Sequence, residues 1–522
     1  MRRCDGRGLT VCANRVVQCV GVVILAALVW YALRFTQYME PVAGYEYPVD
    51  SRDSVWQNLL CALLVFAVFA GGKALEERMG ERTQRIVCRV TAGIAMLWQG
   101  VWSFLWVLAA DRPPGGDQDS VLSAAIGFLE GNYGALGEGG YCEIYPHQLG
   151  LASLEELIFR ISGGTDYHVM QWILAAMAVG TVYCVYGILK DLSGRTAVVV
   201  PGTLLAGLCT APILYSSWIY GESPYVFFTL LAARMLARYG RKKTVGALAG
   251  VVAAMTLAVL VRKNAMILIL AFCLVGAVSA FAKRDKKLLC AMVLAVLVPA
   301  LCYAGIYKMY ELRSGYEHAK GMPVYGHMYI GLQESEGRCG WYYLYCTNTY
   351  YENDRDTDRA RAAYGELIAQ RWSEMRDTPG YTTWFFKNKI LSQWNAPLYQ
   401  SVYFNFVHGE VHYPKVTAFL DRLSGDLFGA VLWVADRLQF VIYLGMLLYF
   451  AVGIRRDSDP LRHLLAVTVI GGFLFSVMWE AKTRYAFPCY MMMFPPAAIG
   501  YRELAERLWK VIGSYREKKA GR

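Results

Sequence analysis

The sequence contains little charge for its length. Only 18% of its 522 residues are Asp, Glu, Lys or Arg, whereas 56% are hydrophobic and the mean hydropathy is +0.31. Soluble domains are about one quarter charged, and long apolar runs are typical of membrane spans. The composition therefore excludes an ordinary soluble domain and predicts an all-α polytopic membrane protein.

Several nucleotide and redox motifs are also missing. The sequence has no GxxxxGK phosphate loop, no dinucleotide-binding GxGxxG after a strand and no CxxC pair. These absences disfavour an ATP-driven pump and a nicotinamide enzyme. No inverted repeat and no set of Gly/Pro-broken helix pairs is evident, which weakens a secondary transporter.

Acidic residues are outnumbered, but the excess of positive charge indicates topology. Residues 308–427, the largest stretch between apolar runs, hold 13 Lys and Arg against 14 Asp and Glu, a net charge of −1. The net charge of +11 is instead concentrated in short loops at every second hydrophobic boundary: 73–85, 190–195, 239–243, 283–287, 455–463 and the tail from Arg502. This is the positive-inside pattern, so we expect no nucleic-acid partner.

Apolar windows of roughly twenty residues predict about twelve transmembrane helices, with both termini cytoplasmic, in the cell membrane. They lie near 16–36, 55–72, 86–110, 167–189, 196–213, 222–238, 244–261, 264–282, 288–307, 428–453, 464–479 and 485–501. The first is too long for a cleaved signal peptide and is interpreted as a retained helix.

Four regions follow from this topology. They are an N-terminal two-helix addition (1–85), a core with an exterior loop at 111–166 (86–307), a mixed exterior domain (308–427) and C-terminal helices with a cytoplasmic tail (428–522). Within the loop, 121–133 and 145–161 have apolar residues at helical spacing and are expected to lie along the membrane surface. Residues 360–375 are the clearest helix of the exterior domain.

Asp117 and Asp119 follow a Pro-Pro-Gly-Gly turn directly after an apolar helix. A carboxylate held at the membrane–water boundary can act as a general base toward an acceptor hydroxyl. Two carboxylates can also share a divalent cation, although two alone are a weak metal signal. An ordinary solvated loop acid is the simpler alternative.

Further polar groups are expected on the same, non-cytoplasmic side. Arg262, Lys263 and Asn264 interrupt about forty apolar residues, where cations would suit a lipid phosphate unless they only form a turn. Glu222 precedes a helix and either favours its dipole or contacts substrate. Residues 480–485 add three more candidates, Glu480, Arg484 and Tyr485. Such convergence is what an active site needs.

Other groups receive simpler interpretations. His408, Glu410 and His412 lack a metal-binding helical spacing and are interpreted as an exterior loop. Asp436 and Arg437 are expected to pair with each other inside a span. Cys339 and Cys346 either form a disulfide or remain free thiols.

In this order and sidedness, the motifs resemble those of the polytopic C-class glycosyltransferases, the group with the protein O-mannosyltransferases and the lipid A aminoarabinose transferases. Asp117-Gln118 is similar to the family's acidic dipeptide, with Gln in place of the second acid. The segments VRKNAMIL and EAKTRYAFP resemble its Arg-containing break and its Glu…Arg-Tyr…Pro motif, and 323–342 is similar to a Gly-rich stretch of Gram-positive members. The resemblance covers roughly residues 86–500.

The resemblance implies an inverting, metal-free sugar transfer in the cell envelope from a polyprenyl-phosphate donor to an extracytoplasmic acceptor. Asp117 would be the base and Arg262 would meet the phosphate, with Lys263 or Arg484 assisting. The substrate-orienting side chains would include Tyr145, His147, Gln148 and Glu222, with Asn264, Asp119, Glu480 and Tyr485 as further contacts.

Three alternatives remain open at the sequence level. A flippase or transporter of polyprenyl-linked glycans would bind the same lipid without chemistry. A metal-dependent oligosaccharyl enzyme would need a divalent cation at Asp117 and Asp119. A scaffold for envelope assembly would need neither Asp117 nor Arg262.

Overall fold

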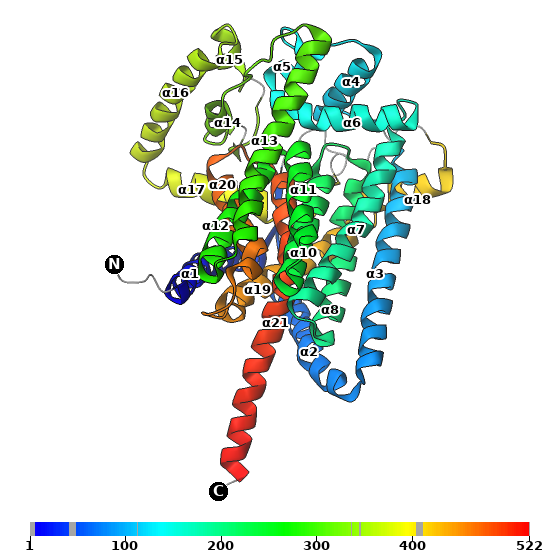
Figure 1. Cartoon of the computed structure of the whole chain (residues 1–522), viewed down its shortest axis with the longest axis vertical. Helices are drawn as coiled ribbons and strands as arrows, with labels where there is room; N and C mark the ends of the chain where they lie inside the picture. Colours follow the sequence, from blue (N-terminus) through cyan, green and yellow to red (C-terminus); the bar gives the residue numbers. More distant parts are fainter. Residues whose placement is uncertain are drawn as a thin grey trace.

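In the computed structural model, the chain forms a bundle of long helices with a helical cap at one end and a projecting C-terminal helix at the other (Figure 1). The structure describes residues 6–40, 48–111, 113–335, 337–343, 346–402 and 411–520. Its described strands form only two two-stranded antiparallel sheets, with the bounds β1 Phe35–Met39, β2 Pro48–Arg52, β3 Glu334–Ser335 and β4 Arg338–Cys339.

Eight helical segments in the described residues are long and apolar enough to cross a membrane. The helices in these segments are α1 Gly6–Ala32, α2 Val55–Arg78, α3 Glu81–Ala110, α7 His168–Leu192, α12 Met266–Lys283, α13 Lys286–Ser314, α19 Phe428–Leu448 and α20 Leu464–Met478. A ninth span results if α8 (Thr196–Leu208) and the following turn 211–217, bent by 41°, are counted as one. The prediction of a helical, multi-span membrane protein is thus confirmed, but the count of twelve is not.

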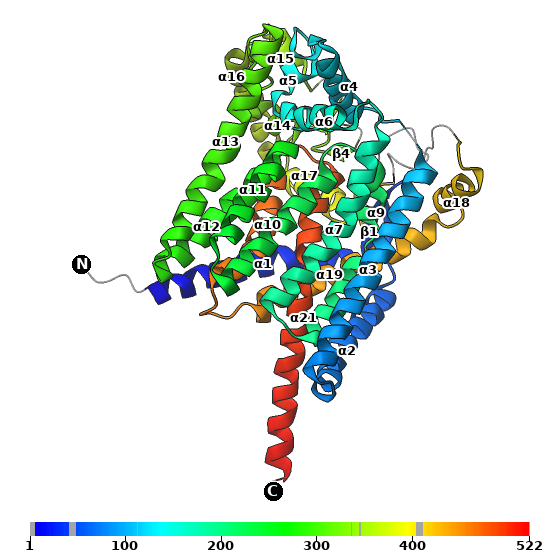
Figure 2. The same cartoon turned by 45° about the vertical axis from the view of Figure 1, so that its right-hand side comes forward.

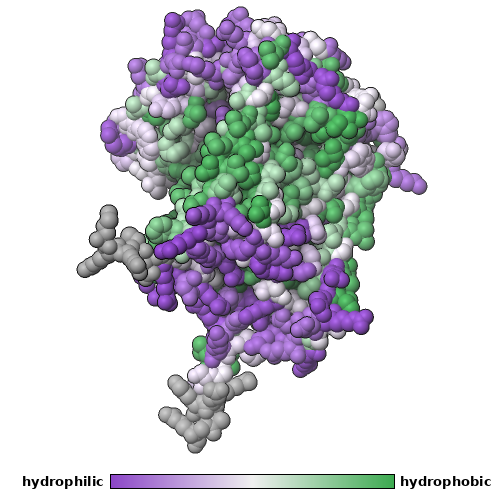
Figure 3. All heavy atoms as spheres, viewed as in Figure 1, coloured by the Kyte–Doolittle hydropathy of each residue, from purple (hydrophilic) through white to green (hydrophobic). Residues whose placement is uncertain are grey.

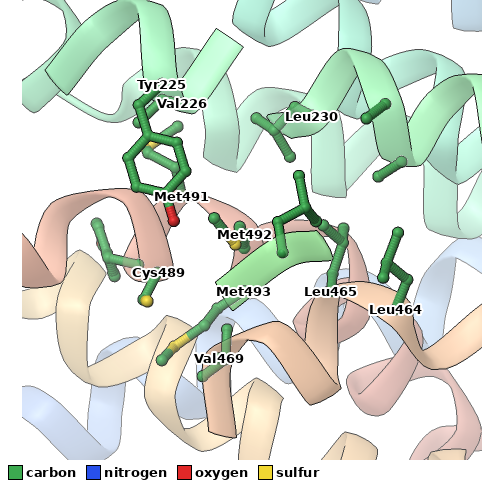
Figure 4. Packing of buried hydrophobic residues seen from close by; sticks show 14 of the residues in the cluster. Tyr225, Val226, Leu230, Leu464, Leu465, Val469, Cys489, Met491, Met492 and Met493 are labelled. Carbon is green, nitrogen blue, oxygen red and sulfur yellow. The ribbon is translucent and has the colours of Figure 1, made fainter. Parts of the chain in front are cut away.

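The remaining long helices lack the length or the hydropathy expected of a membrane span, and this has a physical reason. Helix α10 (Glu222–Lys242) and the first half of α21 (Thr483–Ala520) pack inside the bundle, from which the second half of α21 projects (Figure 1), and α11 (Val245–Val261) is short. A helix that faces protein instead of lipid does not need a uniformly apolar surface. In α21 the consecutive residues Met491, Met492 and Met493 are fully buried between α10 and α20 (Figure 4).

The cap consists of segments 117–162 and 324–377, together with the upper end of α13 (Figures 1 and 2). Its helices are α4 Asp117–Glu130, α5 Tyr141–Ile144, α6 Leu149–Ser162, α14 Val324–Ile330, α15 Asn348–Glu352 and α16 Thr357–Asp377. Helix α17 (Tyr381–Trp394) runs beneath it, and α18 (Pro414–Ser424) packs beside the upper end of α3. Figure 3 shows an apolar band between this polar cap and a second polar region below.

The helices that the sequence predicts for the cap are present. Helix α4 ends at Gly131, whose left-handed backbone (φ 83°) suits a residue without a Cβ. Helix α6 follows Pro146, and α16 contains the predicted 360–375 segment. In contrast, the described part of 308–427 is mainly helical instead of mixed, because its only strands are two residues long.

The two halves of the cap are joined by ion pairs and hydrogen bonds. Arg313 at the end of α13 lies 2.7 Å from Glu156 of α6. The phenol of Tyr350 donates to Glu143 over 2.9 Å, and the backbone N–H of Met322 donates to the carbonyl of Ile144 over the same distance. Loop 111–166 and the downstream cap segments therefore form one packed structure.

The predicted pairing of Asp436 with Arg437 is confirmed at 3.0 Å, and a second carboxylate, Asp53, lies 3.6 Å from the same guanidinium. Arg437 also donates to Asn58 over 2.5 Å. One buried cation thus holds together the start of α2 and the middle of α19.

We therefore expect Arg437→Met to destabilise the protein by about 3–5 kcal/mol, because two buried carboxylates lose their cation. The measurement is the midpoint of thermal unfolding in detergent. A second variant, Arg437→Met with Asp436→Asn, should recover part of the loss. An unchanged midpoint in the single variant would contradict this role of Arg437.

Candidate functional site

A cavity of about 510 Å³ lies beneath the cap, within the size range of small-molecule sites. Segments far apart in the sequence form its walls: the start of α4, the 3₁₀ turns Pro146–Gln148 and Lys263–Ala265, the turn before α10, α14, and the start of α21. Four cationic side chains line it against two carboxylates, namely Arg262, Lys263, Lys482 and Arg484 against Asp117 and Glu480. The cavity is therefore suited to an anionic ligand.

Asp117 is the first residue of α4, where the sequence predicted a loop. Gly116 precedes it with φ 63°, a left-handed conformation that turns the chain from the proline segment into the helix. Its carboxylate accepts a hydrogen bond from Arg484 over 2.9 Å and remains 44% exposed. Asp117 is thus oriented by a fixed cation and still accessible to a ligand in the cavity.

Arg262 and Arg484 form the cationic side of the cavity. Arg262 pairs with Glu222, and the side chain of Arg484 lies 3.7 Å from the same carboxylate. Trp218 donates to the other oxygen of Glu222 over 2.9 Å. Glu222 is only 1% exposed, so its role is to orient the two guanidinium groups.

A glycine permits this arrangement. Gly221 has φ 96°, and a Cβ on it would come within 2.7 Å of the carbonyl oxygen of Val261. The turn before α10 can therefore lie directly against the end of α11. This contact brings Glu222 beside Arg262, although forty residues separate them in the sequence.

Aromatic rings surround the two arginines. The guanidinium of Arg262 lies 4.4 Å from the ring of Tyr220, and that of Arg484 lies 5.2 Å from the same ring. The hydroxyl of Tyr220 is held by Gln148 at 2.6 Å and by Tyr141 at 2.9 Å. Cation–π contacts of this kind help to keep the guanidinium groups ordered.

Two histidines and a glutamate occupy the far side of the cavity. His327 of α14 lies 3.8 Å from Glu480 and stacks on Trp479 at 4.8 Å between ring centres. His147 faces it, with 6.2 Å between ring centres. Burial, His327 and the nearby cations together hold the pKa of His147 well below its usual value. His147 therefore favours its uncharged form.

A second, smaller cavity shares this polar wall. It contains Arg262, Arg484 and Tyr485 and continues between α12 and α20 along apolar side chains that include Ile267 and Phe475. The site thus extends from the arginines toward the interior of the bundle.

Most predicted site residues are brought together. The larger cavity is lined by Asp117, Tyr145, His147, Gln148, Arg262, Lys263, Asn264, Glu480, Arg484 and Tyr485, and Glu222 lines the smaller one. Asp119 is exposed, does not line either cavity and accepts from Ser123 over 3.4 Å. Gln118, between the two carboxylates, is buried and accepts from the N–H of Ile219 over 3.0 Å. Its role is to attach α4 to the turn before α10.

The divalent-cation alternative has no support in this geometry. Residues two apart on a helix do not face each other, so Asp117 and Asp119 diverge. Among the described residues, no group of three or more His, Cys, Asp or Glu side chains is placed to hold a metal ion. The predicted loop residues His408 and Glu410 lie outside the described residues.

Some contributors to the site were not predicted as site residues. The cavity also includes Trp218, Tyr220, His327, Tyr342 and Tyr351, of which His327 and Tyr342 lie in the 323–342 stretch that the sequence analysis noted. Cys339 and Cys346 are separate buried thiols in different apolar clusters, so the disulfide alternative does not hold here.

The segment before Asp117 has an anchor that sequence reasoning also missed. Asp111, six residues before Asp117, accepts from His168 at 2.9 Å and from His412. Although burial raises the pKa of this carboxyl, the hydrogen bonds to His412 and His168 bring it below its usual value. This anchor fixes the end of α3 against the start of α7.

Comparisons with known proteins found no matching family model, no matching curated protein and no matching solved structure.

Proposed function

We propose that the protein is a membrane glycosyltransferase that moves a sugar from a polyprenyl-phosphate donor to an extracytoplasmic acceptor. The observation that carries the proposal is the pairing, in one cavity, of an accessible carboxylate with two buried arginines. A transferase needs a base on one side of the anomeric carbon and a phosphate-binding group on the other. The cavity offers both.

In this proposal the donor phosphate contacts Arg262 and Arg484, with Lys263 nearby. Guanidinium groups bind phosphate oxygens through paired N–H donors. Because Glu222 and the ring of Tyr220 already hold the arginines, little reorganisation is needed when negative charge moves onto the leaving phosphate. Catalysis then results from stronger stabilisation of that charge in the transition state.

Asp117 acts as the general base. It accepts the proton of an acceptor hydroxyl whose oxygen forms the new bond to the anomeric carbon. The bond between that carbon and the phosphate oxygen breaks on the opposite face, and its electron pair leaves with the polyprenyl phosphate. The configuration at the anomeric carbon is therefore inverted.

The smaller cavity supports a lipid donor. It holds about 30 Å³ beside the arginines and is lined further in by Ile267 of α12 and Phe475 of α20, so apolar side chains adjoin the charged site where a hydrocarbon chain would begin. In the proposed topology, the cap and its cavity face the exterior and both termini are cytoplasmic. A flippase would use the same lipid contacts, but it would have no use for an accessible carboxylate at the arginines.

The test uses purified protein and radiolabelled undecaprenyl-phosphate sugars. We expect release of free polyprenyl phosphate, unchanged by a chelator, because the described residues of the site do not assemble a metal-binding group. Movement of donor across vesicle bilayers without release would favour the flippase. Loss of release in chelator, restored by added divalent cation, would favour the metal-dependent enzyme.

A further inference from the structure

One group of the residues that line the cavity differs from the arginines in chemistry. We define the acceptor wall as His327, Thr347, Tyr351 and Tyr342 from the downstream half of the cap, together with Trp479. It presents aromatic rings, hydroxyl groups and an imidazole, and none of its members is a carboxylate or an amine. The wall is therefore rich in rings and neutral polar groups, with the carboxylate of Glu480 3.8 Å from His327, whereas the arginine side of the cavity is cationic.

We propose that the acceptor wall binds a carbohydrate, so that the sugar is transferred to a hydroxyl of a second glycan. This inference rests on the proposed function and specifies its acceptor. The C–H faces of sugar rings are apolar and pack on aromatic rings, while their hydroxyls exchange hydrogen bonds with phenol, hydroxyl and imidazole groups. Rings combined with neutral polar groups are the two features that the wall supplies.

The wall is less suited to other acceptors. An extended peptide is commonly recognised by pairing with an exposed strand edge. Neither β3 nor β4, the described strands of this region, contributes a residue to the cavity lining. A phosphorylated acceptor would need cations in addition to those proposed to bind the donor phosphate. The remaining cation in the cavity lining is Lys482, whose ammonium group lies 5.2 Å from the ring of Trp341.

The exposed fraction of the wall residues increases toward the opening of the cavity. Thr347 and His327 are largely buried, whereas Tyr342 and Tyr351 are 38% and 45% exposed. Helix α15 is fixed because its Tyr350, only 1% exposed, donates to Glu143. A short rigid helix therefore presents the neighbouring Tyr351 at the opening, where a chain of several sugars extends outward.

The experiment first measures binding without donor. Full-length protein in detergent is titrated by calorimetry with neutral tetrasaccharides of glucose, mannose, galactose and N-acetylglucosamine, and with a Ser/Thr-rich peptide of similar length. We expect at least one tetrasaccharide to bind and the peptide not to bind. Removing the ring with Tyr351→Ala should weaken binding about five- to tenfold, whereas Tyr351→Phe should stay within about twofold.

The matched control is Tyr325→Ala, a tyrosine of α14 that is 42% exposed and does not line the cavity. It should leave binding unchanged. Binding of the peptide in a Tyr351-dependent manner, equal saccharide affinity in Tyr351→Ala, or no binding by any tetrasaccharide would overturn the inference.

Release of polyprenyl phosphate from the donor, measured in parallel, separates the two proposals. Release without Tyr351-dependent saccharide binding would remove the acceptor assignment and keep the transferase. Saccharide binding without release would remove the transferase and keep the carbohydrate site.

Discussion

Replacing Asp117 by Asn is expected to lower the turnover number by about 10²–10⁴-fold, the usual contribution of a general base. The amide keeps the size of the side chain and can still accept from Arg484, so the fold and donor binding should change little. The measurement is single-turnover release of radiolabelled polyprenyl phosphate at saturating donor, with donor KM determined separately.

Asp119→Asn is the matched control, because Asp119 lies two residues further along the same helix but is exposed and outside the cavity lining. It should retain nearly full activity. Equal losses in both variants would point to a shared metal site, and full activity in Asp117→Asn would remove this residue from the mechanism.

Arg262→Gln is expected to have two effects. The first is loss of stability of about 3–5 kcal/mol, since Glu222 is buried and would lose its main cation. The second is a fall in kcat/KM for the donor of about 10²–10³-fold, the range found when one donor to a developing anion is removed. Thermal unfolding and donor kinetics measure the two effects independently.

A double variant separates folding from chemistry. Glu222→Gln combined with Arg262→Gln removes both members of the buried pair, so most of the stability should return. Donor kcat/KM should not recover, because the phosphate still lacks Arg262. Recovery of both quantities would mean that Arg262 acts only through the fold.

The sequence by itself determined the class of structure. Low charge, long apolar runs and alternating basic loops indicate membrane helices wherever a segment must face lipid, and the cap helices α4, α6 and α16 follow from local periodicity. The helices predicted at 222–238 and 485–501 are present as α10 and α21, but they are not among the helices apolar enough to count as spans, since a helix that packs on protein is not constrained by lipid. The sequence therefore predicted a helical membrane protein correctly, whereas the predicted number of spans was not confirmed.

The charged candidate site residues were predictable because a charge was out of place in an apolar context. Asp117, Arg262 and Arg484 met this condition because a charge at a membrane boundary is costly without a function. Asp119 met it equally but points away from the cavity, because residues two apart on a helix diverge. Sequence spacing alone did not distinguish the two carboxylates.

Only the tertiary structure decided which groups meet. The contact of Arg484 with Asp117 joins residues 367 positions apart, and no local pattern encodes such a distance. Tyr220, His327 and Tyr351 are ordinary residues in the sequence and become part of the site only because α4, α14, α15 and α21 pack around one cavity. Packing of this kind depends on the summed shape of many side chains.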